Sequence, residues 1–378
     1  MTSLPRDIPA LTGLRSFAAW WVVVQHFGPW LLTLPGAALL APIVHSGHIG
    51  VDVFFVLSGF ILAHNYLHRF QNGVSAGQWG RFLQQRLARI YPTHLVTLLI
   101  MLALFLLFGP LDPAVPYTPA SFLANVFLVH AWGGPGLWTW NYPAWRISCE
   151  WAAYLTFPVL AWLGMRVRSG WLAAGLAAVS LLFMLAGMFV TARADLEGAQ
   201  PLIRIAGEFT AGVLMYRAQQ LGAMNWLRGA WSPLAAAGGL IGVAAAAIMV
   251  GVDALVAVPF AALLVPALAL GHGRIVEALS RPAAVYWGQV SFAVYMVHGI
   301  IELLTRRFMP VAEFAAMPLV ARLIIVVGLM AMVALTAQGM FRFVEEPARK
   351  RLRPAVPATL SSHATIPAAS APNATQGD

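Results

Sequence analysis

The sequence predicts an all-α integral membrane protein with about ten transmembrane helices and with both termini in the cytoplasm. Of its 378 residues, 60% are hydrophobic and only 10% are charged, whereas soluble globular domains carry about 25% charged residues. The mean hydropathy is +0.75. Apolar segments that approach the length of a bilayer crossing recur along most of the chain. These three observations argue against a soluble fold.

A helix needs about 20 predominantly apolar residues to cross the hydrocarbon layer. Ten candidate spans follow from this criterion: residues 11–31, 49–68, 93–109, 147–165, 171–192, 203–220, 232–251, 253–271, 283–304 and 319–342. The fourth contains Glu150 and the sixth contains Glu208, so both are weaker candidates. A shorter apolar stretch, residues 121–130, is expected to be interfacial or re-entrant.

The distribution of basic residues predicts the orientation. Of the 23 lysine and arginine residues, 17 fall at span ends on one side and six on the other. The positive-inside rule places the richer side, with both termini, in the cytoplasm. Because the net charge of +9 is divided among short segments between spans, we interpret it as a topology signal and as a potential anionic-ligand site. It does not indicate nucleic acid as a partner.

The chain divides into a membrane domain, residues 1–350, and a tail, residues 351–378. The tail is rich in Pro, Ala and Ser without periodicity, which predicts a disordered cytoplasmic segment. The single Cys149 excludes an internal disulfide and a cysteine-based metal cluster. We expect no metal site.

Arg15 and His26 fall on the same face of the first span. They are eleven residues apart, which is about 16 Å and three helical turns. A charged residue in the middle of a span costs about 2.5–3.5 kcal/mol on insertion scales, so it usually faces a cavity or a partner. An interfacial anchor at Arg15 and a structural core histidine at His26 are the alternatives. Together the two residues predict a lined passage.

Carboxylates and a second histidine are expected near His26. Asp52 begins the second span at a similar depth, where a carboxylate that accepts the imidazole Nδ1–H would leave Nε2 as a general base; helix capping is the alternative. Arg146 and Glu150 are four residues apart and could pair on one helical face. His298 falls in the outer half of the ninth span. We expect the histidines and carboxylates to converge on the outer side.

Arg86 and Arg89 precede the third predicted span. They are three residues apart and therefore neighbours on a helix. Guanidinium groups bind phosphate in a bidentate manner, which makes the pair a candidate site for an anionic head group. Plain positive-inside anchoring is the alternative.

Six segments, in order from residue 11 to about 350, resemble motifs of the acyltransferase-3 family. These bacterial integral membrane enzymes modify surface polysaccharides and other acceptors with acyl-CoA. The segments are Arg15 and His26 with ten residues between them, G-V-D-V-F-F-V-L-S-G-F from Gly50 to Phe60, R-x-x-R at Arg86 and Arg89, W-x-I-S-x-E-x-x-x-Y-L-x-x-P from Trp145 to Pro158, S-x-x-x-Y-x-x-H from Ser291 to His298, and V-E-E-P-A-R-K from Val344. Arg146 departs from the family, which usually has Ser there.

The resemblance implies ten spans around a passage, with the donor entering from the cytoplasm and the acceptor often on the outer side. On this basis Arg86 and Arg89 bind the phosphates of acyl-CoA, and Arg15 holds the donor deeper in the membrane. His26 takes the proton from the acceptor hydroxyl. Either Asp52 or Glu150 orients that histidine.

The same motifs add four supporting residues to the implied site. They are Ser58, Tyr154, Tyr295 and His298. No bound cofactor is implied, because acetyl-CoA or another acyl-CoA is a donor substrate.

We therefore expect an acyl-CoA-dependent O-acyltransferase of the bacterial cytoplasmic (inner) membrane. Its expected acceptor is a sugar hydroxyl of an exopolysaccharide, a lipopolysaccharide or a related glycan that can be lipid-linked, and membrane lipid surrounds it. One alternative is acylation of a small molecule or a lipid. Another is a non-enzymatic transporter or flippase of an anionic substrate, against which the grouping of histidine with carboxylates and the absence of an internal repeat both argue.

Overall fold

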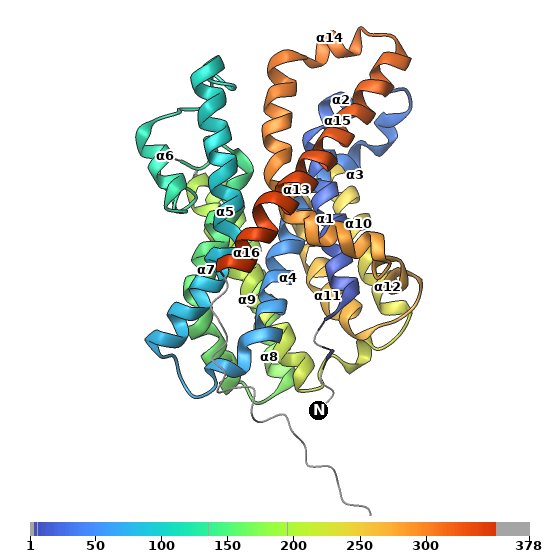
Figure 1. The fold of residues 1–378 in the computed structure, drawn as a ribbon. Coiled ribbons are helices and arrows are strands. Elements are labelled where there is room, and N and C mark those ends of the chain that lie inside the picture. The colour runs from blue at the N-terminus through green and yellow to red at the C-terminus, as the bar shows by residue number, and fades with distance from the viewer. Residues whose placement is uncertain (1–3, 6, 135, 195, 353–378) are drawn as a thin grey trace, which may run out of the picture.

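The computed structural model describes residues 4, 5, 7–134, 136–194 and 196–352. Within these residues the protein is a bundle of helices with no β-strand (Figure 1). Of the predicted tail, Arg351 and Leu352 end the last helix. The rest of the tail, residues 353–378, lies outside the described residues.

Each of the ten predicted spans coincides with a helix. In chain order these are α1 (Pro9–His26), α4 (Ile49–Tyr66), α5 (Ala76–Phe108), α7 (Trp145–Arg166), α8 (Gly170–Arg193), α9 (Gln200–Gln220), α10 (Trp231–Met249), α11 (Val258–Leu270), α13 (Pro282–Phe308) and α15 (Leu319–Met340). Shorter helices lie between them: α2 (Gly28–Leu31), α3 (Ala41–His45), α6 (Pro119–Val126), α12 (Arg274–Leu279) and α14 (Val311–Ala315). One more, α16 (Glu346–Leu352), follows α15. The apolar stretch 121–130 forms only the short α6 and the turn after it.

Six helical segments among the described residues are long and apolar enough to cross a membrane. They are Ala37–Phe70, Ala76–Phe108, Gly170–Arg193, Trp231–Met249, Pro282–Phe308 and Leu319–Leu352. The chain is therefore a multi-pass membrane protein. The count of ten spans and the cytoplasmic placement of the termini stay predictions.

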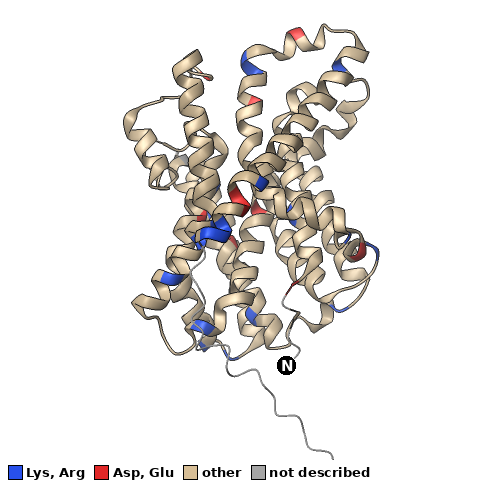
Figure 2. Cartoon of the chain, in the orientation of Figure 1, with Lys and Arg blue, Asp and Glu red and all other residues tan. Residues whose placement is uncertain are grey.

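The peripheral helices are apolar on nearly all sides. In α15 only 6% of the most apolar window is buried inside the protein, and in α8 only 22%. A helix that is hydrophobic all round is buried or lies in a membrane, so these two helices are suited to face lipid. Figure 2 shows that charged residues gather at helix ends and in the middle of the bundle, between long uncharged stretches.

Helix α5 is longer than the predicted third span because it starts with a capping box. The Ser75 hydroxyl accepts from the Gln78 backbone N–H at 3.3 Å, and the Gln78 side chain accepts from the Ser75 N–H at 3.5 Å. This pairing satisfies two amide groups that a helix start leaves open. As a result, Arg86 and Arg89 share one continuous helix with the apolar residues 93–108, through Pro92.

Two helix pairs form the centre of the bundle, α1 with α13 and α4 with α9. Each pair approaches through glycine. A Cβ atom on Gly288 of α13 would collide with the Thr12 carbonyl oxygen of α1. Gly59 of α4 and Gly212 of α9 are reciprocal, because each faces backbone atoms of the other helix. Small residues let membrane helices pack with their backbones close together. This contact fixes the position of α4, which contributes to the site described below.

We predict that Gly212→Ala lowers the thermal unfolding midpoint of the protein in detergent. The added methyl group must push α4 and α9 apart, and overpacking of this kind costs about 1–3 kcal/mol. The matched control is Gly175→Ala on α8, where the added Cβ meets no atom within 4 Å. Circular dichroism melts of the two variants make the comparison. Equal midpoints for both variants would contradict the close contact between α4 and α9.

Candidate functional site

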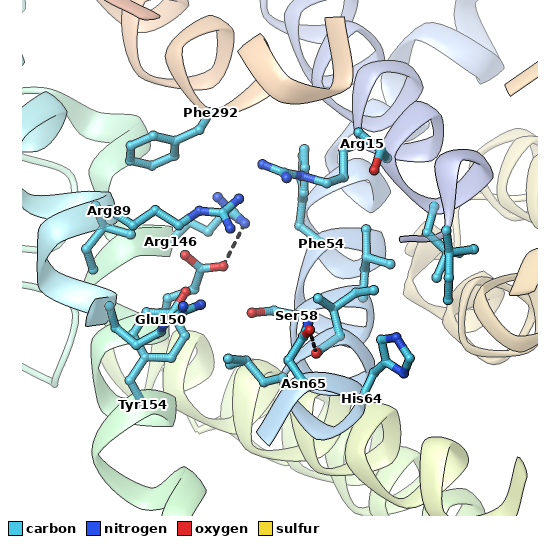
Figure 3. Close-up of a pocket in the computed structure, with 18 of the residues that line it drawn as sticks. Arg15, Phe54, Ser58, His64, Asn65, Arg89, Arg146, Glu150, Tyr154 and Phe292 are labelled. Carbon is cyan, nitrogen blue, oxygen red and sulfur yellow. Dashed lines mark hydrogen bonds and ion pairs between the residues drawn. The ribbon is translucent and has the colours of Figure 1, made fainter. Parts of the chain in front are cut away.

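A cavity of about 200 Å³ lies among five helices, and its lining is rich in arginine (Figure 3). Its polar and charged lining residues are Asp7 before α1, Thr12 and Arg15 of α1, Ser58, His64 and Asn65 of α4, Arg86 and Arg89 of α5, and Arg146, Glu150 and Tyr154 of α7. Phe54 of α4 and Phe292 of α13 are among the apolar ones. The three arginines predicted to bind an anionic donor therefore lie around one cavity.

Arg15 and Arg89 reach toward one another from opposite sides of the cavity (Figure 3). Neither guanidinium has a hydrogen bond or an ion pair with any residue that the structure describes. The acid with which both interact electrostatically is Glu345, which lies in a single-turn π-helix between α15 and α16, Phe341–Glu345. Two partly buried guanidiniums without a paired carboxylate form a ready site for an anion.

Arg86 is held by aromatic groups. Its Nη2 donates to the Tyr66 hydroxyl at 2.9 Å, and its guanidinium lies 5.1 Å from the centre of the Tyr66 ring. The Nε atom is buried and has no hydrogen-bond partner among the described residues. Arg86 is therefore held in place and still has an N–H group that can donate a hydrogen bond to a ligand. Arg89 lies beside it on α5, because residues three apart are neighbours on a helix.

Arg146 of α7 also lines the cavity. Its Nη2 donates to Glu150 Oε1 at 2.9 Å, and both side chains are buried, so the ion pair expected from their spacing is confirmed. The guanidinium also stacks 4.4 Å from the ring of Phe54 and 5.1 Å from that of Tyr295. A cation in an aromatic cage of this kind gains about 0.5–2 kcal/mol per ring contact. Tyr154 and Ser58 line the cavity beside this group.

A second group of polar side chains surrounds His26 at the other end of α1. The His26 Nδ1 atom lies 2.9 Å from the Tyr142 hydroxyl. The ring of His298, on α13, is 5.1 Å from that of His26. The expected approach of His26 and His298 is confirmed.

Tyr295 lies between the two groups. Its ring is 5.1 Å from the Arg146 guanidinium and 5.4 Å from the His298 ring. His26 does not line the arginine-rich cavity, and neither does His298. The prediction of one passage lined by both Arg15 and His26 is therefore wrong for this conformation, because Arg146 and its aromatic cage fill the space between them.

Asp52 does not contact His26. Its fully buried carboxylate accepts three hydrogen bonds from Arg204 of α9, at 2.7, 2.8 and 3.1 Å. The expectation that Asp52 orients the imidazole is wrong, because a buried carboxylate is satisfied best by a bidentate guanidinium. Glu208 of α9, also fully buried, interacts with this pair.

Glu150 also lies away from His26, in the arginine-rich cavity, so its expected convergence with His26 is wrong. The reason is the loop before α7. Tyr142 is already at the level of His26, and α7 begins three residues later. Glu150 is eight residues beyond Tyr142, or about 12 Å along a helix axis. This displacement brings it to the level of Arg15.

The sequence alone did not single out Tyr142, Arg204 or Glu302 as functional residues. Tyr142 belongs to a connecting segment, Tyr142–Ala144, which nothing in the sequence marked as part of the bundle. Glu302 and Arg306 are four residues apart on α13 and form an ion pair, so their spacing was a usable signal. No group of three or more His, Cys, Asp or Glu side chains within the described residues is placed to hold a metal ion.

A profile of acyltransferase domains matches residues 8–337, which include the four arginines of the cavity and the group around His26. The chain belongs to the acyltransferase-3 family. Acyltransferase MdmB of Streptomyces mycarofaciens is 33% identical over 323 residues, covering 78% of this chain and 79% of that protein. O-acetyltransferase OatA of Staphylococcus aureus is 27% identical over 128 residues, 34% of this chain and 19% of OatA. No solved structure matches the chain.

In this acyltransferase-3 protein we expect Asp52→Asn to act on stability. Removing one partner of a buried ion pair leaves an uncompensated charge and costs about 3–5 kcal/mol. The double variant Asp52→Leu/Arg204→Met should recover part of the loss, since it removes both charges. Thermal melts in detergent measure the effect, with Glu346→Gln, which breaks an exposed pair with Lys350, as the control. An Asp52→Asn protein that melts like wild type but lacks activity would instead assign Asp52 to the reaction.

Proposed function

We propose that the protein is a membrane O-acyltransferase that transfers an acetyl group from acetyl-CoA, or another acyl group from its acyl-CoA, to a sugar hydroxyl. The acceptor would belong to an exopolysaccharide, a lipopolysaccharide or a related glycan at the bacterial cytoplasmic membrane. The observation that carries the proposal is the cavity at which Arg15, Arg86 and Arg89 meet inside a membrane bundle. Membership of an acyltransferase family and similarity to a protein named an O-acetyltransferase support it.

The donor would bind through its phosphates. The cavity is lined by four arginines against two acids, Asp7 and Glu150, and Glu150 is already paired with Arg146. Unpaired guanidiniums beside apolar walls bind phosphate groups strongly, because charge-assisted hydrogen bonds gain strength where water is excluded. The open end at Asp7 and His64 would admit the nucleotide part, and the acyl end would point toward Arg146.

His26 would act as the general base. The acceptor hydroxyl oxygen attacks the thioester carbonyl carbon while His26 Nε2 takes the hydroxyl proton. The tetrahedral intermediate then collapses: the carbon–sulfur bond breaks, the sulfur takes the electron pair, and the imidazolium returns the proton to the thiolate. The products are the acyl ester and free CoA. For the thioester to reach His26, the Arg146 guanidinium and the rings of Phe54 and Tyr295 must move aside.

We predict that purified protein in lipid nanodiscs releases free CoA from acetyl-CoA and acetylates methyl glucoside, used as a hydroxyl probe. Arg89→Ala should raise the KM for acetyl-CoA about ten-fold or more, because a hydrogen bond to a charged group contributes about 1.5–3 kcal/mol. His26→Ala should lower kcat by about 10²–10⁴ with little change in KM. Thiol release and mass spectrometry of the glycoside give the rates.

The matched control for Arg89 is Arg81→Ala, an exposed arginine on the same helix outside the cavity. It should keep the wild-type KM. Binding of acetyl-CoA without any release of CoA, with water or with methyl glucoside, would favour a transporter of anionic substrates over an acyltransferase. A wild-type kcat in His26→Ala would remove the assignment of the base.

A further inference from the structure

The group that orients His26 is neither of the two carboxylates expected from the sequence. Asp52 is committed to Arg204 and Glu150 to Arg146. A general base at Nε2 still needs its other ring nitrogen fixed, because an imidazole with a free Nδ1 samples both tautomers. The neighbour of Nδ1 in this structure is the Tyr142 hydroxyl, at 2.9 Å.

Behind Tyr142 lies a buried carboxylate that no motif assigns. Glu302 of α13 is fully buried and interacts with the Tyr142 hydroxyl. Arg306 donates to it through Nε and Nη2, and both of these bonds go to Oε1. Glu302 Oε2 is buried and has no hydrogen-bond partner among the described residues. It is therefore open to a bond from the tyrosine hydroxyl.

The direction of these bonds follows from the chemistry of the three groups. Because Glu302 is paired with a guanidinium, it is ionised and can only accept. The Tyr142 proton then points to Glu302, and the hydroxyl oxygen is left to accept from His26. This order requires the proton of neutral His26 to be on Nδ1, with Nε2 free.

We propose that Tyr142 and Glu302 are positioning residues for His26. Tyr142 links the negative charge of the Glu302 carboxylate to the imidazole through hydrogen bonds. The link keeps the proton of neutral His26 on Nδ1, leaves Nε2 to accept the acceptor's proton, and stabilises the resulting imidazolium. This assignment rests on the proposed function for its catalytic meaning, but the geometry that it describes can be tested without turnover.

Tyr142 is held rigidly enough for such a role. Gly299 of α13 has no side chain, and Pro143 packs into the space where its Cβ would be. The Asn141 amide donates to the Met296 carbonyl oxygen at 3.0 Å. Trp140 has a positive φ of 55° and is buried, a conformation that costs energy and persists only where packing enforces it. The loop is therefore anchored on both sides of the tyrosine.

Other polar groups around His26 do not replace this pair. The ring of His298 is tilted by 43° against that of His26, but no hydrogen bond joins the two histidines in the part of the chain that the structure describes. Tyr295 faces His298 from the cavity side. Arg306 and His48 interact with His26 only electrostatically, and no hydrogen bond joins either of them to His26 among the described residues. Glu302, by contrast, is connected to His26 through Tyr142.

The kinetic test compares Tyr142→Phe and Glu302→Gln with wild type in nanodiscs, using acetyl-CoA and methyl glucoside. Each variant should lower kcat about 10–100-fold, the range typical for partners that orient a reacting group, and leave the KM for acetyl-CoA unchanged. The double variant should lose no more than the worse single variant, because the two residues act through one another. Glu302→Asp should retain more activity than Glu302→Gln.

The matched control is Tyr286→Phe, on the same helix as Glu302 but bonded to Gln338 rather than to a histidine. It should keep the wild-type kcat. Full activity in Tyr142→Phe, or additive losses in the double variant, would overturn the proposal.

A spectroscopic test does not depend on turnover. In protein labelled with ¹⁵N-histidine, the His26 signal is identified among the ten histidines by its loss in His26→Asn. The proposal expects the Nδ1–H tautomer in wild type and a mixture in Tyr142→Phe. If the wild-type enzyme releases no CoA, the proposed function fails while this comparison still decides the positioning. An Nε2–H tautomer in wild type would overturn it.

Discussion

The structure depends on one constraint: a charge inside a membrane bundle must find a partner or face water. Most of the buried charges described here meet it by pairing. Arg204 forms an ion pair with Asp52, Arg146 with Glu150, and Arg306 with Glu302, each through short hydrogen bonds. Three arginines of the cavity have no such carboxylate: Arg86 donates to Tyr66, and Arg15 and Arg89 interact with Glu345 only electrostatically. These guanidiniums therefore retain hydrogen-bonding capacity that an anion from outside the protein can use.

Helix α13 connects the two polar groups. Phe292, Tyr295, His298, Glu302 and Arg306 follow one another at spacings of three or four residues, so their side chains fall on one face of the helix. That face passes from the wall of the arginine-rich cavity, past the Arg146 cage and the His26 ring, to a guanidinium that is half exposed. Gly288, where α13 meets the backbone of α1 at Thr12, holds this face at a fixed depth relative to Arg15 and His26. Donor binding and proton transfer, in the proposed reaction, thus share one rigid element.

Patterns that depend on a single helix were predicted correctly, and those that depend on how helices and loops meet were not. The ten helix positions follow from apolar length, and the Arg146–Glu150 pair follows from four-residue spacing. The approach of His26 to His298 follows from the first and ninth spans running in the same direction, with each histidine in the outer half of its span. The prediction for Asp52 was wrong because its partner, Arg204, is 152 residues away in the sequence, and no local pattern links two residues that far apart. The predicted convergence of Glu150 with His26 was wrong because the loop around Tyr142 sets the depth at which α7 begins. Contacts with Gly299 and Met296 fix the path of this loop, and no local sequence pattern encodes those contacts.

In the proposed reaction, the separation of the cavity from His26 would protect the thioester donor. A base held beside a bound acyl donor would activate water as readily as an alcohol, and the donor would be lost to hydrolysis. In this conformation Arg146, stacked on Phe54 and Tyr295, stands between the two. The ion pair with Glu150 and the two ring contacts hold Arg146 in this position. All three are side-chain contacts, so Arg146 can leave this position without a change in the backbone. A phosphate group bound at Arg15 and Arg89 would compete with Glu150 for the Arg146 guanidinium, since all of them line the same small space. Donor binding would then loosen the barrier that keeps the donor from the base.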